Sequence, residues 1–137
     1  MIKDELVTYE VAKLAREKGF NEGCLYHYST NSELHANYNY NCDGVGLSDL
    51  RYDNDTLWYP NSEVVAPSQS LLQRWLREEK GYYVYPFFDN DSERWTWVCR
   101  ERTGNMWIPL VDFEVRHFAT YEPALEDGLK YVLDNLV

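Results

Sequence analysis

Three histidines and three cysteines are the residues of this chain whose chemistry best suits metal binding or nucleophilic catalysis. They are His27, His35, His117, Cys24, Cys42 and Cys99. Their spacing matches no known set of metal ligands, and the cysteines stand too far apart for a CxxC metal or redox motif. Nothing in the neighbouring sequence marks a thiol as activated. We therefore expect Cys24 and Cys99 to be reduced and buried, and we expect no metal and no cofactor.

Carboxylates are plentiful, since the chain has 23 Asp and Glu residues. The stretches 53–55 (DND) and 89–93 (DNDSE) place oxygen ligands at alternate positions, as calcium loops do. Neither continues into the glycine and distal glutamate of a helix-loop-helix calcium site, so we interpret both as turns. No feature selects one carboxylate pair for glycosidase or nuclease chemistry. The sequence therefore predicts a protein that is not an enzyme.

The charge and length of the chain restrict its partners and its location. With 137 residues it is long enough for one domain with a real hydrophobic core. The formal net charge of −10 is spread along the chain and repels phosphate backbones, so we expect no direct nucleic-acid binding. The sequence has neither an apolar signal core nor a run long enough to cross a bilayer. These features favour a protein of the cytoplasm without membrane contact.

Helix and strand signals alternate along most of the chain. Helices are predicted from Thr8 to Lys18, from Ser68 or Ser70 to Gly81, and after Thr120. Strands are predicted at residues 23–28, 82–88, 94–102, 106–110 and 111–118. This order is typical of an α+β fold with three helices on one face of a small, mainly antiparallel sheet, all within one domain, residues 1–137.

Residues 29–66 differ from the rest of the chain because turn residues are interleaved with aromatic ones. We expect this Asn/Tyr-rich segment to be an irregular excursion within the domain, which is unusual in a compact fold and favours a functional region or a tolerated insertion. Tyr38, Tyr40, Trp58 and Tyr59 stand there in polar surroundings. Exposed Trp and Tyr anchor protein interfaces and can also stack on sugars, although closing the open face of a sheet would explain them equally well.

The three helical segments resemble a family of small uncharacterised proteins encoded in bacteriophages and prophage-like regions of gut anaerobic bacteria. The resemblance lies in residues 9–20 (YEVAKLAREKGF), 66–78 (APSQSLLQRWLRE) and 121–129 (YEPALEDGL). It covers about half of the chain and implies a mobile-element origin and action in the host cytoplasm. It implies no catalytic residue and no cofactor.

These observations lead to three hypotheses about function. The first is a non-enzymatic module that binds a protein of the host or phage through Tyr38, Tyr40, Trp58 and Tyr59. The second is an acidic nucleic-acid mimic that inhibits a host defence enzyme, which needs carboxylates at phosphate-like spacing on one face. The third is carbohydrate binding through surface Trp and Tyr.

Overall fold

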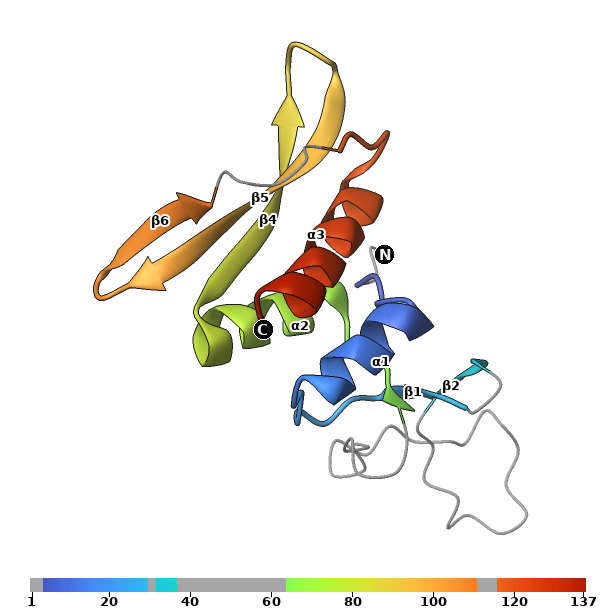
Figure 1. The fold of residues 1–137 in the computed structure, drawn as a ribbon. Helices are drawn as coiled ribbons and strands as arrows, with labels where there is room; N and C mark the ends of the chain where they lie inside the picture. The colour runs from blue at the N-terminus through green and yellow to red at the C-terminus, as the bar shows by residue number, and fades with distance from the viewer. Residues whose placement is uncertain (1–3, 30–31, 37–63, 111–115) are drawn as a thin grey trace, which may run out of the picture.

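The computed structural model describes residues 4–29, 32–36, 64–110 and 116–137 and confirms the α+β class (Figure 1). Within these residues the strands form two antiparallel sheets of three strands each, where one sheet was expected. The strand order is β2-β1-β3 in the small sheet and β4-β5-β6 in the large sheet. The predicted strand over residues 111–118 falls mostly outside the described residues, as does most of the 29–66 segment.

The first helix, α1 (Tyr9–Glu17), begins and ends where the sequence predicts. The Thr8 hydroxyl accepts a hydrogen bond from the Val11 N–H (3.3 Å), which satisfies one of the free donors of the first turn. After the helix, Gly19 adopts a left-handed conformation (φ 94°). The Phe20 N–H then donates to the Ala15 carbonyl (2.9 Å), so the chain turns back and buries the Phe20 ring.

The second helix, α2 (Gln69–Trp75), continues without a break into one π-helical turn, η2 (Leu76–Lys80). Ser68 caps the start, because its hydroxyl accepts from the Leu71 N–H (3.1 Å). Gly81 ends the π turn in a left-handed conformation (φ 78°), and its N–H bonds to the Leu76 carbonyl. The wider π turn changes the direction of the side chains that follow Leu76, including that of Arg77.

The large sheet consists of β4 (Tyr82–Asp89), β5 (Arg94–Thr103) and β6 (Met106–Leu110). Val84 pairs with Cys99, and Cys99 pairs with Leu110, so these three side chains share one face. The last helix, α3 (Tyr121–Asn135), lies along this inner face (Figure 1). Pro86 lies on β4, which is an edge strand of the sheet, as the missing N–H donor predicts.

The small sheet consists of β1 (Tyr26–Tyr28), β2 (Leu34–Ala36) and β3 (Val64–Val65). His27 of β1 pairs with His35 on one side and with Val65 on the other. Two strands thus form near the ends of the segment that was expected to be irregular, and that prediction is wrong for β2 and β3. The Tyr28 hydroxyl donates to the Val7 carbonyl (2.6 Å), which connects this sheet to the chain before α1.

One buried cluster unites the helices with both sheets. Side chains from α1, α2, η2 and α3 meet strand residues there, and Gln69 and Thr96 are the polar residues buried in the described part of the chain. The largest fully buried members include Phe20, Leu72, Leu76, Leu129 and Leu133. The predicted burial of Cys24 and Cys99 is confirmed, and both are reduced thiols.

Candidate functional site: the outer face of the large sheet

The face of the large sheet opposite to α3 is lined by aromatic and arginine side chains. Because side chains alternate along a strand, the neighbours of buried Val84 and Cys99 point to this other side. We call it the outer face and define it by seven residues: Tyr83, Tyr85, Phe87, Val98, Arg100, Arg102 and Trp107.

No helix among the described residues covers the outer face. Among the described residues, the helical elements that contact the large sheet are α2, η2 and α3. Their buried side chains belong to the same cluster as Val84 and Cys99, which places these elements on the inner face or at its end. Phe87 on this face is 51% exposed. Exposed apolar side chains on a sheet face that no described helix covers are typical of a contact surface.

The aromatic rings of the outer face contact one another. Tyr83 and Tyr85 follow one another on the same face of β4, with ring centroids 4.7 Å apart. The ring of Trp107, on β6, meets Tyr83 edge to face at 6.1 Å across the intervening strand. Mutual packing leaves each of these rings half-buried and restricts its rotamers, while part of its surface stays open to solvent.

Guanidinium groups lie beside these rings. Arg77 comes from the π turn, and its guanidinium carbon lies 5.4 Å from the centroid of Tyr83, within the range of a cation–π contact. The Arg100 Nε donates to the Tyr85 hydroxyl (3.1 Å). Arg102 pairs in register with Trp107. Three arginines thus lie beside the residues of the ring cluster, at the end of the sheet that follows Gly81.

The charges of β5 are sorted between the two faces of the sheet. Glu101 lies between Arg100 and Arg102 in the sequence but belongs to the inner face, opposite Tyr82. Burial and the Glu101 carboxylate raise the pKa of Tyr82. In the described chain, Arg77, Arg100 and Arg102 form no ion pair. The outer face therefore carries a local positive charge on a protein whose net charge is −10.

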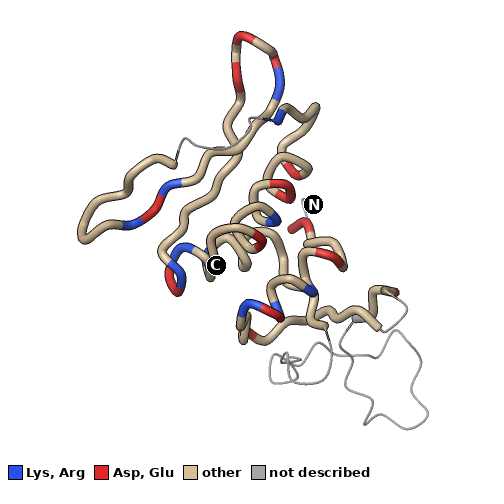
Figure 2. The backbone as a smooth tube through the Cα atoms, in the orientation of Figure 1, with Lys and Arg blue, Asp and Glu red and all other residues tan. Residues whose placement is uncertain are grey.

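The opposite end of the outer face, at the turn between β4 and β5, carries Asp89, Asp91, Glu93 and Arg94, and Figure 2 shows both red and blue there. Asp89 ends β4, and its carboxylate lies 3.5 Å from Nε2 of His117. The Asp91 N–H and the Ser92 hydroxyl donate to this carboxylate, and they hold its pKa below the usual range. Arg94 pairs in register with Asp89 on the same face, so the outer face changes along β4 from three arginines to a mixed end with a net negative charge.

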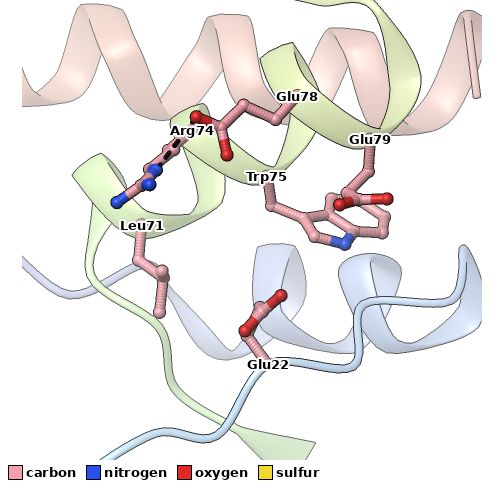
Figure 3. Close-up of a pocket in the computed structure, with 6 residues that line it drawn as sticks. All are labelled: Glu22, Leu71, Arg74, Trp75, Glu78 and Glu79. Atoms are coloured by element: carbon pink, nitrogen blue, oxygen red, sulfur yellow. Dashed lines mark hydrogen bonds and ion pairs between the residues drawn. The ribbon is translucent and has the colours of Figure 1, made fainter.

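A hollow of about 210 Å³ lies on the other side of the α2–η2 segment (Figure 3). Its lining consists of Glu22, Leu71, Arg74, Trp75, Glu78 and Glu79. Arg74 pairs with Glu78 (3.1 Å), and both side chains are more than half exposed. Carboxylates of this kind attract cations only weakly when solvent screens them, so we assign the hollow no binding role.

A second hollow, of about 300 Å³, lies beside α3. Asp127 lines this hollow and accepts two hydrogen bonds. One carboxylate oxygen accepts from Trp97 Nε1 (2.9 Å) and the other from Arg116 (3.0 Å). This arrangement satisfies a donor of a buried indole, so we interpret Asp127 as a structural residue.

The residues predicted from sequence as contacts, Tyr38, Tyr40, Trp58 and Tyr59, lie outside the described residues. Sequence reasoning did not single out the outer face. Two features of the sequence could have indicated this face. Thr96, Val98 and Arg100 alternate on one side of a predicted strand, and a run of tyrosines precedes Pro86 on the neighbouring strand. The described residues contain no group of three His, Cys, Asp or Glu side chains placed to hold a metal ion. Across the same residues, no helix is long and apolar enough to span a membrane.

Comparisons of the chain with models of known families, with curated proteins and with solved structures find no match. The resemblance to phage-encoded proteins therefore stays a prediction. Among the described residues, the outer face is the surface where aromatic and arginine side chains suited to binding a partner lie together.

Proposed function

We propose that this protein is a non-enzymatic interaction module that binds a protein partner through the outer face of its large sheet. One observation carries this proposal. Tyr83, Tyr85 and Trp107 form a contiguous ring cluster with arginines on a sheet face that no described helix covers. Tyr, Trp and Arg are the residue types that dominate binding energy at protein interfaces.

The geometry of the cluster also keeps the cost of binding low. Tyr83 contacts Tyr85, Trp107 and Arg77 in the free protein, so its ring is already held in one position. A side chain that is ordered before binding loses less rotamer entropy, which amounts to roughly 0.5–1.5 kcal/mol for each residue. A rigid aromatic surface on a sheet is therefore well suited to recognition.

The sequence adds two elements to the proposal. The aromatic residues Tyr38, Tyr40, Trp58 and Tyr59 are a second contact region, proposed on composition alone. The resemblance to phage-encoded proteins makes a host or phage protein the proposed partner, with action in the host cytoplasm. The acidic-mimic hypothesis gains no support from the outer face, because Arg77, Arg100 and Arg102 occupy it.

Affinity purification with outer-face variants tests the proposal. Tagged wild-type protein and the Tyr83→Ala and Trp107→Ala variants are expressed in the native host, and the captured proteins are identified by mass spectrometry. Tyr121→Ala is the matched control, because Tyr121 is 42% exposed and lies on α3, away from the outer face. We expect a partner that is captured by wild type and by the control but is lost with both outer-face variants.

Circular dichroism on the purified variants must show an unchanged fold for this comparison to count. Equal capture by all four proteins would place the contact elsewhere on the chain and would contradict the proposal.

A further inference from the structure

Building on the proposed function, we infer that the partner presents a segment that is acidic at one end and apolar at the other. Its carboxylates bind the guanidinium groups of Arg77, Arg100 and Arg102, and its apolar side chains pack on Phe87 and Val98. The inference rests on how charge and apolar surface are distributed along the outer face.

The arginines have free donors at this face. Arg100 uses Nε to bind the Tyr85 hydroxyl, which leaves its two terminal nitrogens for a partner. Arg77 lies over the Tyr83 ring and forms no ion pair in the described chain. A planar guanidinium held in this way binds a carboxylate through two parallel hydrogen bonds. Carboxylates are therefore the groups that this end of the face fits best.

The middle of the outer face favours apolar groups. Tyr85 pairs with Val98 across the strands, and Phe87 pairs with Thr96. Thr96 is buried, whereas the Phe87 ring is about half exposed, so this part offers apolar surface and few free polar atoms. Beyond it, the turn carries Asp89, Asp91 and Glu93 against the single cation of Arg94, and this net negative charge would repel a second acidic group. A bound segment is thereby oriented with its acidic end toward Arg102.

The same pattern argues against a nucleic-acid strand as the occupant. A strand carries a phosphate at every nucleotide, so a run along β4 would pass from the arginines to the carboxylates of Asp89, Asp91 and Glu93. The net charge of −10 adds repulsion at low salt. A peptide with carboxylates at one end only avoids both effects.

Peptide selection tests this inference directly. A display library of random short peptides is selected on immobilised full-length protein, and the enriched sequences are synthesised with a fluorescent label. We expect Asp and Glu to cluster at one end of these peptides and apolar residues at the other. In fluorescence anisotropy, Arg100→Gln and Arg102→Gln should each weaken binding about tenfold, as expected for loss of one charge-assisted contact.

The control variant is Lys13→Gln, which removes an exposed cation from α1 and should leave affinity unchanged. Phe87→Ser should weaken binding of the same peptides without changing their salt dependence. Enriched peptides without an acidic end would overturn the inference, and so would failure to enrich any peptide. Tighter binding of a labelled oligothymidine than of the peptides would also overturn it.

The outcomes separate this inference from the proposed function. If Tyr83→Ala loses a cellular partner while selected peptides show no acidic end, the interaction module stands and the partner chemistry is wrong. If neither experiment depends on the outer face, both are wrong.

Discussion

Gly128 on α3 lies so close to Trp97 on β5 that a Cβ atom at position 128 would stand 2.8 Å from the indole Cγ. The same atom would be 2.7 Å from Cγ2 of Val84. Real Cβ atoms are not found at such distances, so the helix can approach the sheet this closely only with glycine. A glycine inside a helix costs about 1 kcal/mol relative to alanine, and this close packing explains its presence.

Gly128→Ala should therefore destabilise the protein despite the better helix propensity of alanine. The propensity gain is about 1 kcal/mol, whereas overpacking a closed core costs about 1–3 kcal/mol. Val84 and Trp97 are both buried and have little room to move. We expect a net loss of about 1 kcal/mol or more in urea denaturation, and an increase in stability would show that the interface can relax.

Ser68→Ala should lower the free energy of unfolding by about 1 kcal/mol, because the hydroxyl caps α2 through the Leu71 N–H. Thr120→Ala is the matched comparison. Thr120 also occupies an N-cap position, but its side chain makes no capping hydrogen bond in the structure. Its replacement should change stability by less than about 0.5 kcal/mol. Equal losses for the two variants would mean that the hydroxyl of Ser68 is not the cause.

Asp127→Ala should cost about 1–3 kcal/mol of stability, because it removes the acceptor of the buried Trp97 N–H. Arg116→Gln isolates the other half of this contact. The Arg116 side chain is 64% exposed, so losing its ion pair with Asp127 should cost at most about 1 kcal/mol. Chemical denaturation followed by tryptophan fluorescence compares the two variants, and a larger loss for Arg116→Gln would contradict this assignment.

The buried thiols should make the protein less stable at alkaline pH. Burial raises the pKa of Cys24 and of Cys99 to about 12 in the folded protein. Unfolded thiols ionise near pH 8.5, at about their ordinary pKa, so above that value the unfolded state loses protons that the folded state retains. Stability is fully present below about pH 8.5 and falls by up to about 1.4 kcal/mol per pH unit for each thiol as pH rises toward 12.

Urea denaturation across this pH range measures the effect. A Cys24→Ala, Cys99→Ala double variant should show a shallower decline, although its baseline stability is lower because two core side chains are shortened. Thiol labelling with peptide mapping gives a second readout, in which Cys24 and Cys99 react only after denaturant is added. Rapid labelling of either residue in the native protein would contradict its burial.

Local signals in the sequence were sufficient to predict much of the fold. Thr8 and Lys18 were predicted as the ends of the first helix, and Gly81 as the end of the second. Both predictions agree with the structure because N-caps and left-handed glycines act within a few residues. Pro86 lacks an N–H donor and so indicated an edge strand or a bulge, and β4 is an edge strand. The continuation of α2 as a π turn was not predicted, since no residue type specifies it.

The second sheet could not be predicted in the same way. β3 contains only Val64 and Val65, too short a strand for a period-two pattern, and its partner His27 is far away in the sequence. The outer face was missed for a related reason. Tyr82, Tyr83 and Tyr85 place bulky rings on both sides of β4, so alternation alone does not reveal which side α3 covers. The position of Gly128 against Val84 decides it.

The pairing of β1 with β3 fixes both ends of the intervening segment at one place on the body of the protein. The Ala66 N–H donates to the Tyr26 carbonyl (2.8 Å), directly beside the paired residues His27 and Val65. The entropy of closing a chain rises only with the logarithm of its length, by about 0.6 kcal/mol for each doubling. A change in the number of residues between Ala36 and Val64 should therefore have only a small effect on the free energy of unfolding.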